Sequence, residues 1–147
     1  MSETVLVPVK NHAPWAETVA DAAAAVEDED TDVVVLHVFD EAEAESTRQN
    51  LDDEDTLTLD DLASRKRGVN AAIDVLAEEG LSSRPRGAHE DERTADAILR
   101  VAESEDADRL YVYGRKRSPA GKAVFGSTVQ RLILNAGVPV TVVPPAG

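Results

Sequence analysis

The chain has 147 residues and no cysteine, which suits a single domain over residues 1–147 and excludes disulfides, thiolate catalysis and cysteine-based zinc sites. Its 29 acidic residues outnumber its 15 basic ones, for a formal net charge of −14, and this excess favours a halophilic protein and argues against a nucleic-acid partner. No apolar run is long enough for a signal peptide or a membrane span, so we expect a cytoplasmic protein without a membrane partner.

The first half of the chain predicts two buried strands. Both Thr4–Val9 and Asp32–Phe39 are nearly continuous hydrophobic runs, as in parallel strands that are covered on both faces. A helix lies between them, with Trp15 and Val26 on its apolar stripe. The segment 40–58 is polar and acidic and has no periodicity, so we expect a long mobile insertion there.

The middle of the chain alternates between helices and strands. One helix carries Leu62 and Leu76 on its apolar stripe. The polar run Ser83–Gly87 follows, and because it contains a proline we place it at the edge of the sheet. A further helix is capped by Thr94 and leads into the apolar strand Leu110–Tyr113.

The last part of the chain contains a loop, a helix and a strand. The loop 114–128 begins at Gly114, the helix is capped by Ser127 or Thr128, and the strand is Pro139–Val143. The whole alternation predicts an α/β fold, an open parallel five-stranded sheet of order 3-2-1-4-5 with helices on both faces. Ligands bind such sheets at the carboxyl ends of the strands, so we expect a cleft between the first and fourth strands.

The distribution of charge marks the loop 114–128 as a candidate anion site. The segment Glu27–Asp61 carries fifteen acidic residues and one basic residue, whereas the chain from Arg109 onward carries six basic residues and no acidic ones. Four of those six lie in the loop, namely Arg115, Lys116, Arg117 and Lys122. Amide groups at the start of the final helix would reinforce them. The alternative is that these cations pair with carboxylates of the chain or are solvated.

Four stretches of the sequence together resemble the universal stress protein family. They read VLVPVK, VVVLHVFD, ADAILRVAESEDADRLYVYG and FGSTVQRLILNAGVPVTVV. The glycine-serine pair before the last helix, followed by a proline-valine strand, is the most specific of these signals. The resemblance implies a flavodoxin-like fold, a homodimer through the C-terminal strand Pro139–Val143 and a cytoplasmic role in the stress response. Some members of the family bind ATP and others do not.

The glycine pattern of the ATP-binding members is matched in part. Gly114 fits its first glycine and Gly126 its terminal pair, but Arg117 stands in the place of the second glycine, and Gly121 offers a different turn. Lys10 stands where the family usually has an aspartate that faces the adenine. We therefore expect a site that holds phosphate more strongly than adenine. The candidate binding residues are Val9, Lys10, Asn11, Val38, Gly114, Arg115, Arg117, Gly121, Lys122, Gly126, Ser127 and Thr128.

These observations predict a dimeric, non-enzymatic, ligand-binding or regulatory module with no catalytic residues and no metal site. The expected ligand is ATP or another phosphate-bearing molecule, with Mg²⁺ optional. Two alternatives stay open: a protein-interaction module that binds no nucleotide, and a slow Mg²⁺-dependent nucleotide hydrolase at the same cleft. His37, in the middle of a strand, is expected to be a core residue with its hydrogen bonds satisfied.

Overall fold

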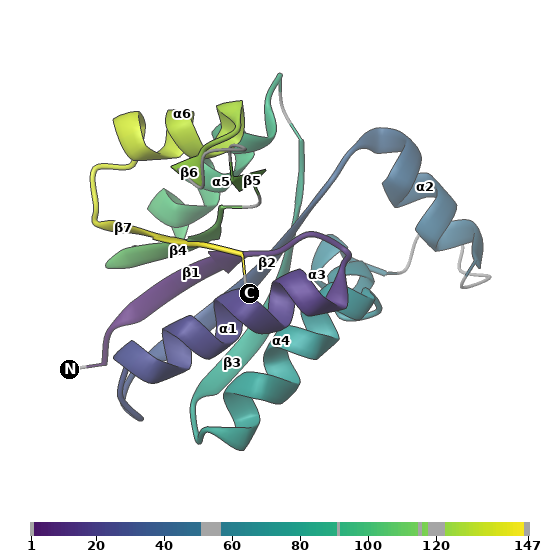
Figure 1. Cartoon of the computed structure of the whole chain (residues 1–147). Helices are drawn as coiled ribbons and strands as arrows, with labels where there is room; N and C mark the ends of the chain where they lie inside the picture. Colours follow the sequence, from purple (N-terminus) through teal and green to yellow (C-terminus); the bar gives the residue numbers. More distant parts are fainter. Residues whose placement is uncertain (1, 51–56, 91, 115, 118–122, 146–147) are drawn as a thin grey trace.

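A computed structural model shows an open five-stranded parallel sheet with helices on both faces (Figure 1). It describes residues 2–50, 57–90, 92–114, 116–117 and 123–145. The strand order is β3-β2-β1-β4-β7, which confirms the predicted order 3-2-1-4-5. The strands are β1 (Thr4–Pro8), β2 (Asp32–Phe39), β3 (Ser82–His89), β4 (Arg109–Tyr113) and β7 (Val140–Val143).

Two apolar layers hold the helices against the sheet. One face is covered by two helices and the other face by two more: α1 (Ala13–Val26) and α4 (Arg67–Glu78), then α5 (Thr94–Ser104) and α6 (Ser127–Asn135). Side chains of a strand alternate between the faces. In β1, Val5 and Val7 therefore pack with α1 and α4, and Leu6 packs with α5 and α6.

Strand β3 lies at one edge of the sheet, as its proline predicts. Pro85 pairs with Val35 of β2, and no other described strand pairs with β3. A proline is tolerated at that position because its missing N–H can face away from the ladder. The strand is longer than the predicted Ser83–Gly87, since parallel pairing with β2 continues to His89.

The segment after β2 differs from the prediction. Instead of an aperiodic insertion, the chain forms helix α2 (Glu41–Asn50), and residues 51–56 lie outside the described part. The carboxylate of Asp40 accepts a hydrogen bond from the amide of Glu43 at 2.7 Å, which starts the helix. Ala44 is buried beside Phe39. The helix therefore arises from an acidic cap and one small apolar contact, signals that hydrophobic periodicity does not contain.

The predicted second helix is divided into two. Helix α3 (Leu59–Ala63) begins at a capping box between Thr58 and Asp61, and α4 begins after a short break. At that break the chain passes very close to the end of β1. A Cβ atom on Gly68 would lie 2.1 Å from the carbonyl oxygen of Lys10, and the Gly68 amide donates to Asn11 Oδ1 at 3.1 Å. The β1–α1 connection is thereby fixed to the start of α4.

Three helix details also differ from the sequence expectations. The N-cap of α6 is Gly126, so Ser127 and Thr128 lie inside the helix and do not cap it. The N-cap of α5 is Arg93, and Thr94 instead donates its hydroxyl to a neighbouring carboxylate. Val26 is 70% exposed, because the buried residues of α1 are those of another stripe: Ala16, Val19, Ala20 and Ala23.

The loop 114–128 contains a short antiparallel pair of strands, β5 (Lys116–Arg117) and β6 (Ala123–Val124). In Figure 1 this strand pair lies close to α6. Among the described residues, no helix has the length and hydrophobicity needed to cross a bilayer.

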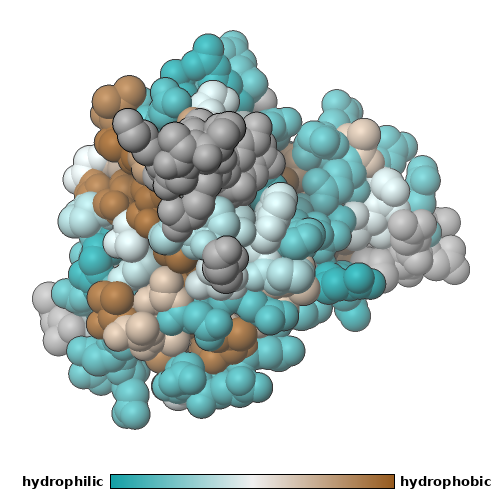
Figure 2. All heavy atoms as spheres, in the orientation of Figure 1, coloured by the Kyte–Doolittle hydropathy of each residue, from teal (hydrophilic) through white to brown (hydrophobic). Residues whose placement is uncertain are grey.

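The surface is unevenly hydrophobic. In Figure 2 hydrophilic side chains cover the α2 side, and apolar side chains gather at the upper left, where Figure 1 shows α6 and β7. Leu134 and Ile133 of α6 are 80% and 46% exposed, and Val140 and Val142 of β7 are only partly buried. The edge of the sheet at β7 is therefore the apolar edge.

Candidate functional site

A cleft of about 360 Å³ opens where β1, β2 and β4 end. The connection after β1 lines it with Val9–Asn11, and the start of α6 lines it with Gly126–Thr128. The helices that follow β1 and β4 lie on opposite faces of the sheet, so the ends of these neighbouring strands separate. The cleft therefore lies at the point where parallel sheets of this kind bind ligands.

The β4 side of the cleft attracts anions. The N-cap of α6 is a glycine, so no N-cap side chain accepts hydrogen bonds from the amide groups of the first turn. Gly126 and Ser127 are exposed, and Thr128 is partly exposed. These amides point outward from the positive end of the helix dipole. Lys10, exposed at the end of β1, adds a full positive charge to the same cleft.

The β2 side of the cleft has the opposite character. Its lining residues include the acidic residues Asp40, Glu43 and Glu90 and the histidine His37. An ionised carboxylate only accepts hydrogen bonds. The cleft thus has helix amides beside β4 and several acceptor groups on the β2 side, where Lys66 also pairs with Glu43.

An aromatic pair forms part of the wall. Trp15, in the first turn of α1, stacks on Tyr113 at the end of β4, with ring centroids 5.3 Å apart and planes inclined by 22°. Both residues line the cleft. Their flat apolar surface suits a planar ring system better than it suits a bare anion.

The carboxylate of Glu43 contacts both His37 and Lys66. His37 Nε2 lies 2.6 Å from Glu43 Oε2, and Lys66 Nζ lies 2.9 Å from that same oxygen. Burial lowers the pKa of His37 below its usual value, although the neighbouring Glu43 opposes this effect. The other ring nitrogen, Nδ1, is buried and has no hydrogen-bond partner within the described part of the chain. The expectation of a fully satisfied core histidine is therefore wrong for one of its two nitrogens.

The sequence matches the family model described as the universal stress protein family over residues 1–144. The chain belongs to the universal stress protein family. A universal stress protein of Mycolicibacterium smegmatis is 40% identical over 52 residues, which span 35% of this chain and 40% of that protein.

Solved structures of universal stress proteins share the fold. One from Archaeoglobus fulgidus superposes with a TM-score of 0.70 at 24% identity, over 97% of this chain and 99% of that one. A second structure, of the universal stress protein from Archaeoglobus fulgidus in complex with dAMP, gives a TM-score of 0.67 at 20% identity, over 96% and 97% of the two chains.

The predicted binding residues of this universal stress protein divide into four groups. Seven of them line the cleft: Val9, Lys10, Asn11, Val38, Gly126, Ser127 and Thr128. Gly114 does not line it, since this buried glycine donates its amide to the carbonyl of Val143 at 2.8 Å. For Arg117 only the backbone is described, in β5. Arg115, Gly121 and Lys122 lie outside the described residues.

The sequence analysis did not predict that Trp15, Tyr113 and Glu43 line the cleft. Trp15 was assigned to the core stripe of a helix, but it lies in the first turn after β1, close to the strand ends. Tyr113 is the last residue of β4, directly before Gly114. Because both residues lie next to the end of a strand, their place in the cleft could have been predicted. Glu43 gave no such signal, because it lies in the segment that was expected to lack helix.

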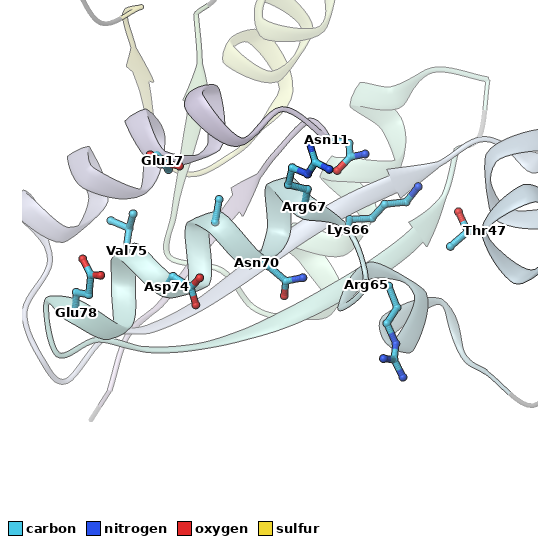
Figure 3. Close-up of a pocket in the computed structure, with 11 residues that line it drawn as sticks. Asn11, Glu17, Thr47, Arg65, Lys66, Arg67, Asn70, Asp74, Val75 and Glu78 are labelled. Carbon is cyan, nitrogen blue, oxygen red and sulfur yellow. The ribbon is translucent and has the colours of Figure 1, made fainter. Parts of the chain in front are cut away.

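A second, larger groove runs between α1, α2 and α4 (Figure 3). The connection into α4 and its first residue line one part of the groove with the consecutive cations Arg65, Lys66 and Arg67. Further along the helix, Asp74 and Glu78 make the groove acidic. Asn11 lines both this groove and the cleft. The groove is open and has no aromatic side chain among its lining residues, so the cleft is the better candidate site.

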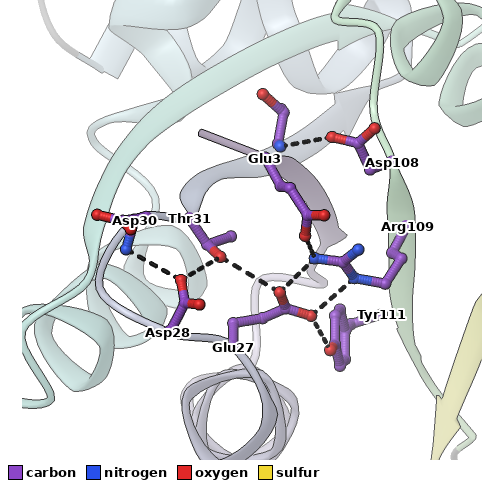
Figure 4. A network of polar contacts seen from close by, with 9 residues as sticks. Glu3, Glu27, Asp28, Asp30, Thr31, Asp108, Arg109 and Tyr111 are labelled. Atoms are coloured by element: carbon purple, nitrogen blue, oxygen red, sulfur yellow. Dashed lines mark hydrogen bonds and ion pairs between the residues drawn. The ribbon is translucent and has the colours of Figure 1, made fainter. Parts of the chain in front are cut away.

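The other large polar cluster of this universal stress protein lies at the opposite, amino-terminal edge of the sheet (Figure 4). Glu27, which follows α1, accepts hydrogen bonds from Arg109 and Tyr111 of β4, and Arg109 also pairs with Glu3. Arg109 Nε lies 2.9 Å from Glu27 Oε2. The cluster joins α1 to β4 and is a structural feature. Within the described residues, no group of three acidic or histidine side chains is arranged to hold a metal ion.

Proposed function

We propose that this chain is a non-enzymatic, cytoplasmic stress-response protein that binds a nucleotide in the cleft between β1 and β4. The phosphate lies against the amides at the start of α6, with Lys10 beside it, and Mg²⁺ is optional. The observation that carries the proposal is that the cleft combines groups that bind phosphate with a flat aromatic surface. Exposed helix amides and a lysine lie on one side, and an aromatic pair forms part of the wall.

The family supports the same ligand class. The relative from Archaeoglobus fulgidus was determined in complex with dAMP, and its chain has the same fold over almost its whole length. In this chain Lys10 supplies charge to the phosphate rather than an acceptor to the base. The anion contacts therefore dominate binding, and we expect nucleoside monophosphates, ATP and pyrophosphate to compete for one site.

Two substitutions at one position test the phosphate contact. Ser127→Asp places a carboxylate on the first turn of α6. There it interacts favourably with the helix dipole but repels a bound phosphate. We expect calorimetry at high KCl to show AMP affinity reduced by at least about tenfold with no loss of thermal stability. Ser127→Ala is the matched control, because it removes the hydroxyl and keeps the amides. Absence of binding heat for AMP and ATP with the unaltered protein, and no competition by pyrophosphate, would contradict the proposal.

We also propose that the protein is a homodimer through β7. The β4 amides of Leu110 and Gly114 donate to the carbonyls of Pro139 and Val143. Alternate residues of a parallel strand face the same neighbour, so the backbone polar groups of Val140 and Val142 point to the open edge. An open apolar edge next to the exposed side chains of α6 favours pairing with a second copy.

A further inference from the structure

The two edges of the sheet differ in how far their backbone groups are available. Strand β7 lies at one edge and β3 at the other. An edge strand offers N–H and C=O groups that pair readily with a strand of another molecule. If β7 of one copy paired with β3 of the next, every copy would still leave one of each edge free, and the contact would repeat without end. The state of β3 therefore determines whether pairing through the sheet is limited.

The hydrogen bonds to β2 show which residues of β3 face outward. The amide of Glu90, directly after β3, donates to the carbonyl of Phe39 in β2 at 2.7 Å. Alternate residues of a parallel strand face the same neighbour, so the even-numbered residues of β3 face β2 and the odd-numbered residues face the edge. The outward-facing residues are Ser83, Pro85, Gly87 and His89.

Three of these four outward positions are blocked, each in a different way. Pro85 has no N–H group to donate. The amide of Gly87 donates to Asp60 Oδ1 at 2.8 Å. The carbonyl of His89 accepts a hydrogen bond from the guanidinium of Arg100 at 3.1 Å. A strand that approached from outside would therefore lack a donor at two consecutive outward positions and would have to displace a bound group at the third.

Helix α3 holds Asp60 against the edge. A capping box between Thr58 and Asp61 starts this helix. A Cβ atom on Gly87 would lie 2.2 Å from the carbonyl oxygen of Leu59, so the start of α3 lies directly on the strand at a point where only glycine leaves room for it. The short helix is thus positioned to cover the end of β3.

This closure matters most in concentrated salt. At low ionic strength the net charge of −14 keeps copies of the chain apart. At 1 M salt the Debye length is only about 3 Å, so charge repulsion no longer prevents two strand edges from meeting. A blocked edge acts at any salt concentration, because it depends on missing or occupied hydrogen-bonding groups.

We infer that Pro85, Asp60 and Arg100 close the β3 edge to strand pairing, so that the sheet can add a second copy at β7 only and association stops at two copies. The number of copies rests on the β7 pairing proposed above. The closure of β3 does not, since it follows from contacts within one chain.

Hydrogen exchange tests the contact of Asp60. Asp60→Ala removes the acceptor, so we expect the amide of Gly87 to exchange about tenfold faster, the effect of one lost hydrogen bond. The amide of Ala88 faces β2 and should not change. Asp60→Asn is the matched control, because its side-chain oxygen still accepts. Equal exchange of Gly87 in the unaltered protein and in Asp60→Ala would overturn the role of Asp60.

Light scattering in concentrated KCl tests the closure itself. Pro85→Val combined with Asp60→Ala gives the edge two free outward amides, and we expect at least about double the mass of the unaltered protein. Ser82→Val combined with Asp60→Ala is the matched control. Ser82 faces β2, so this change adds the same side chain without a new outward amide, and the mass should stay that of the unaltered protein.

The inference and the proposed dimer can fail separately. If the Pro85→Val, Asp60→Ala protein is folded, as judged by its melting transition, and keeps the mass of the unaltered protein, the closure is refuted. An unaltered protein that forms assemblies larger than two copies also refutes it. A monomeric unaltered protein refutes the β7 pairing alone, because the gain in mass on opening β3 is measured against that same unaltered protein.

Discussion

At the scale of single residues, the carboxylate of Glu27 accepts hydrogen bonds from Thr31, Arg109 and Tyr111. Hydrogen bonding to Arg109 lowers its pKa below the usual 4.5, with Tyr111 acting in the same direction and burial opposing both. A carboxyl group whose pKa is lower in the folded state stabilises the fold when it is ionised. Its contribution is complete above the unfolded value of about 4.5 and is lost as the pH falls through the lower folded value.

Glu27→Gln tests this linkage. We expect the variant to lose about 2 kcal/mol of unfolding free energy at neutral pH, because a charged hydrogen-bond acceptor becomes neutral. The difference between the two proteins should shrink as the pH falls below about 4.5. Urea denaturation at a series of pH values measures both effects, and a difference that stays constant down to acid pH would contradict the assignment.

Gly68 shows how closely two connections approach each other. Replacing it with alanine would bring a methyl group onto the carbonyl of Lys10, a backbone atom that has no room to move aside. We expect Gly68→Ala to cost about 1–3 kcal/mol of stability. Gly126→Ala is the control, since no atom lies within 4 Å of its added Cβ, and it should cost less than about 1 kcal/mol. Thermal denaturation of both variants gives the comparison.

At the scale of secondary-structure elements, the sequence predicted the strands well because each inner strand is a continuous apolar run. The runs at Thr4 and Asp32 identify central strands, and the proline of β3 identifies an edge. The same reasoning predicted a cleft between the first and fourth strands, where the structure has one, but it placed the cap of α6 at Ser127 or Thr128 instead of Gly126. It failed for α2, which is supported by the Asp40 cap, by the buried contact of Ala44 and by the ion pair between Glu43 and Lys66. The sequence does not show which distant residues pair, because this depends on the fold.

The attachment of α2 gives an element-scale prediction. Glu43 ties this helix to β2 and to Lys66, so Glu43→Ala should let α2 open more often. We expect amide hydrogen exchange within α2 to accelerate by roughly fivefold, as the loss of a partly exposed ion pair implies. Exchange in α5 should not change. Glu45→Ala, at an exposed position of the same helix, controls for helix propensity, and equal acceleration in both variants would argue against the tie.

At the scale of the whole molecule, the net charge of −14 makes the folded chain repel itself. The Debye length falls from about 10 Å at 0.1 M salt to about 3 Å at 1 M. We therefore expect the melting temperature to rise as KCl is raised over this range. Differential scanning calorimetry measures the rise, and sucrose, which screens no charge, serves as the control. A melting temperature that is independent of KCl would contradict the halophilic interpretation.

The proposed dimer is tested by removing one outward-facing amide. Val142→Pro eliminates the N–H that points to the open edge of β7, a change that an edge strand tolerates within its own sheet. We expect light scattering to give twice 15.7 kDa for the unaltered protein and 15.7 kDa for the variant. Val142→Thr keeps the amide and the branched shape, so it should remain dimeric. A monomeric unaltered protein would refute the pairing.

The stacked ring pair of the cleft has a practical consequence. Trp15 is the only tryptophan of the chain, and it lies on the wall where a base would bind. Indole emission excited at the red edge of its absorption therefore originates at one place. A ligand that binds in the cleft should change this emission, so each variant can be titrated optically without an attached dye.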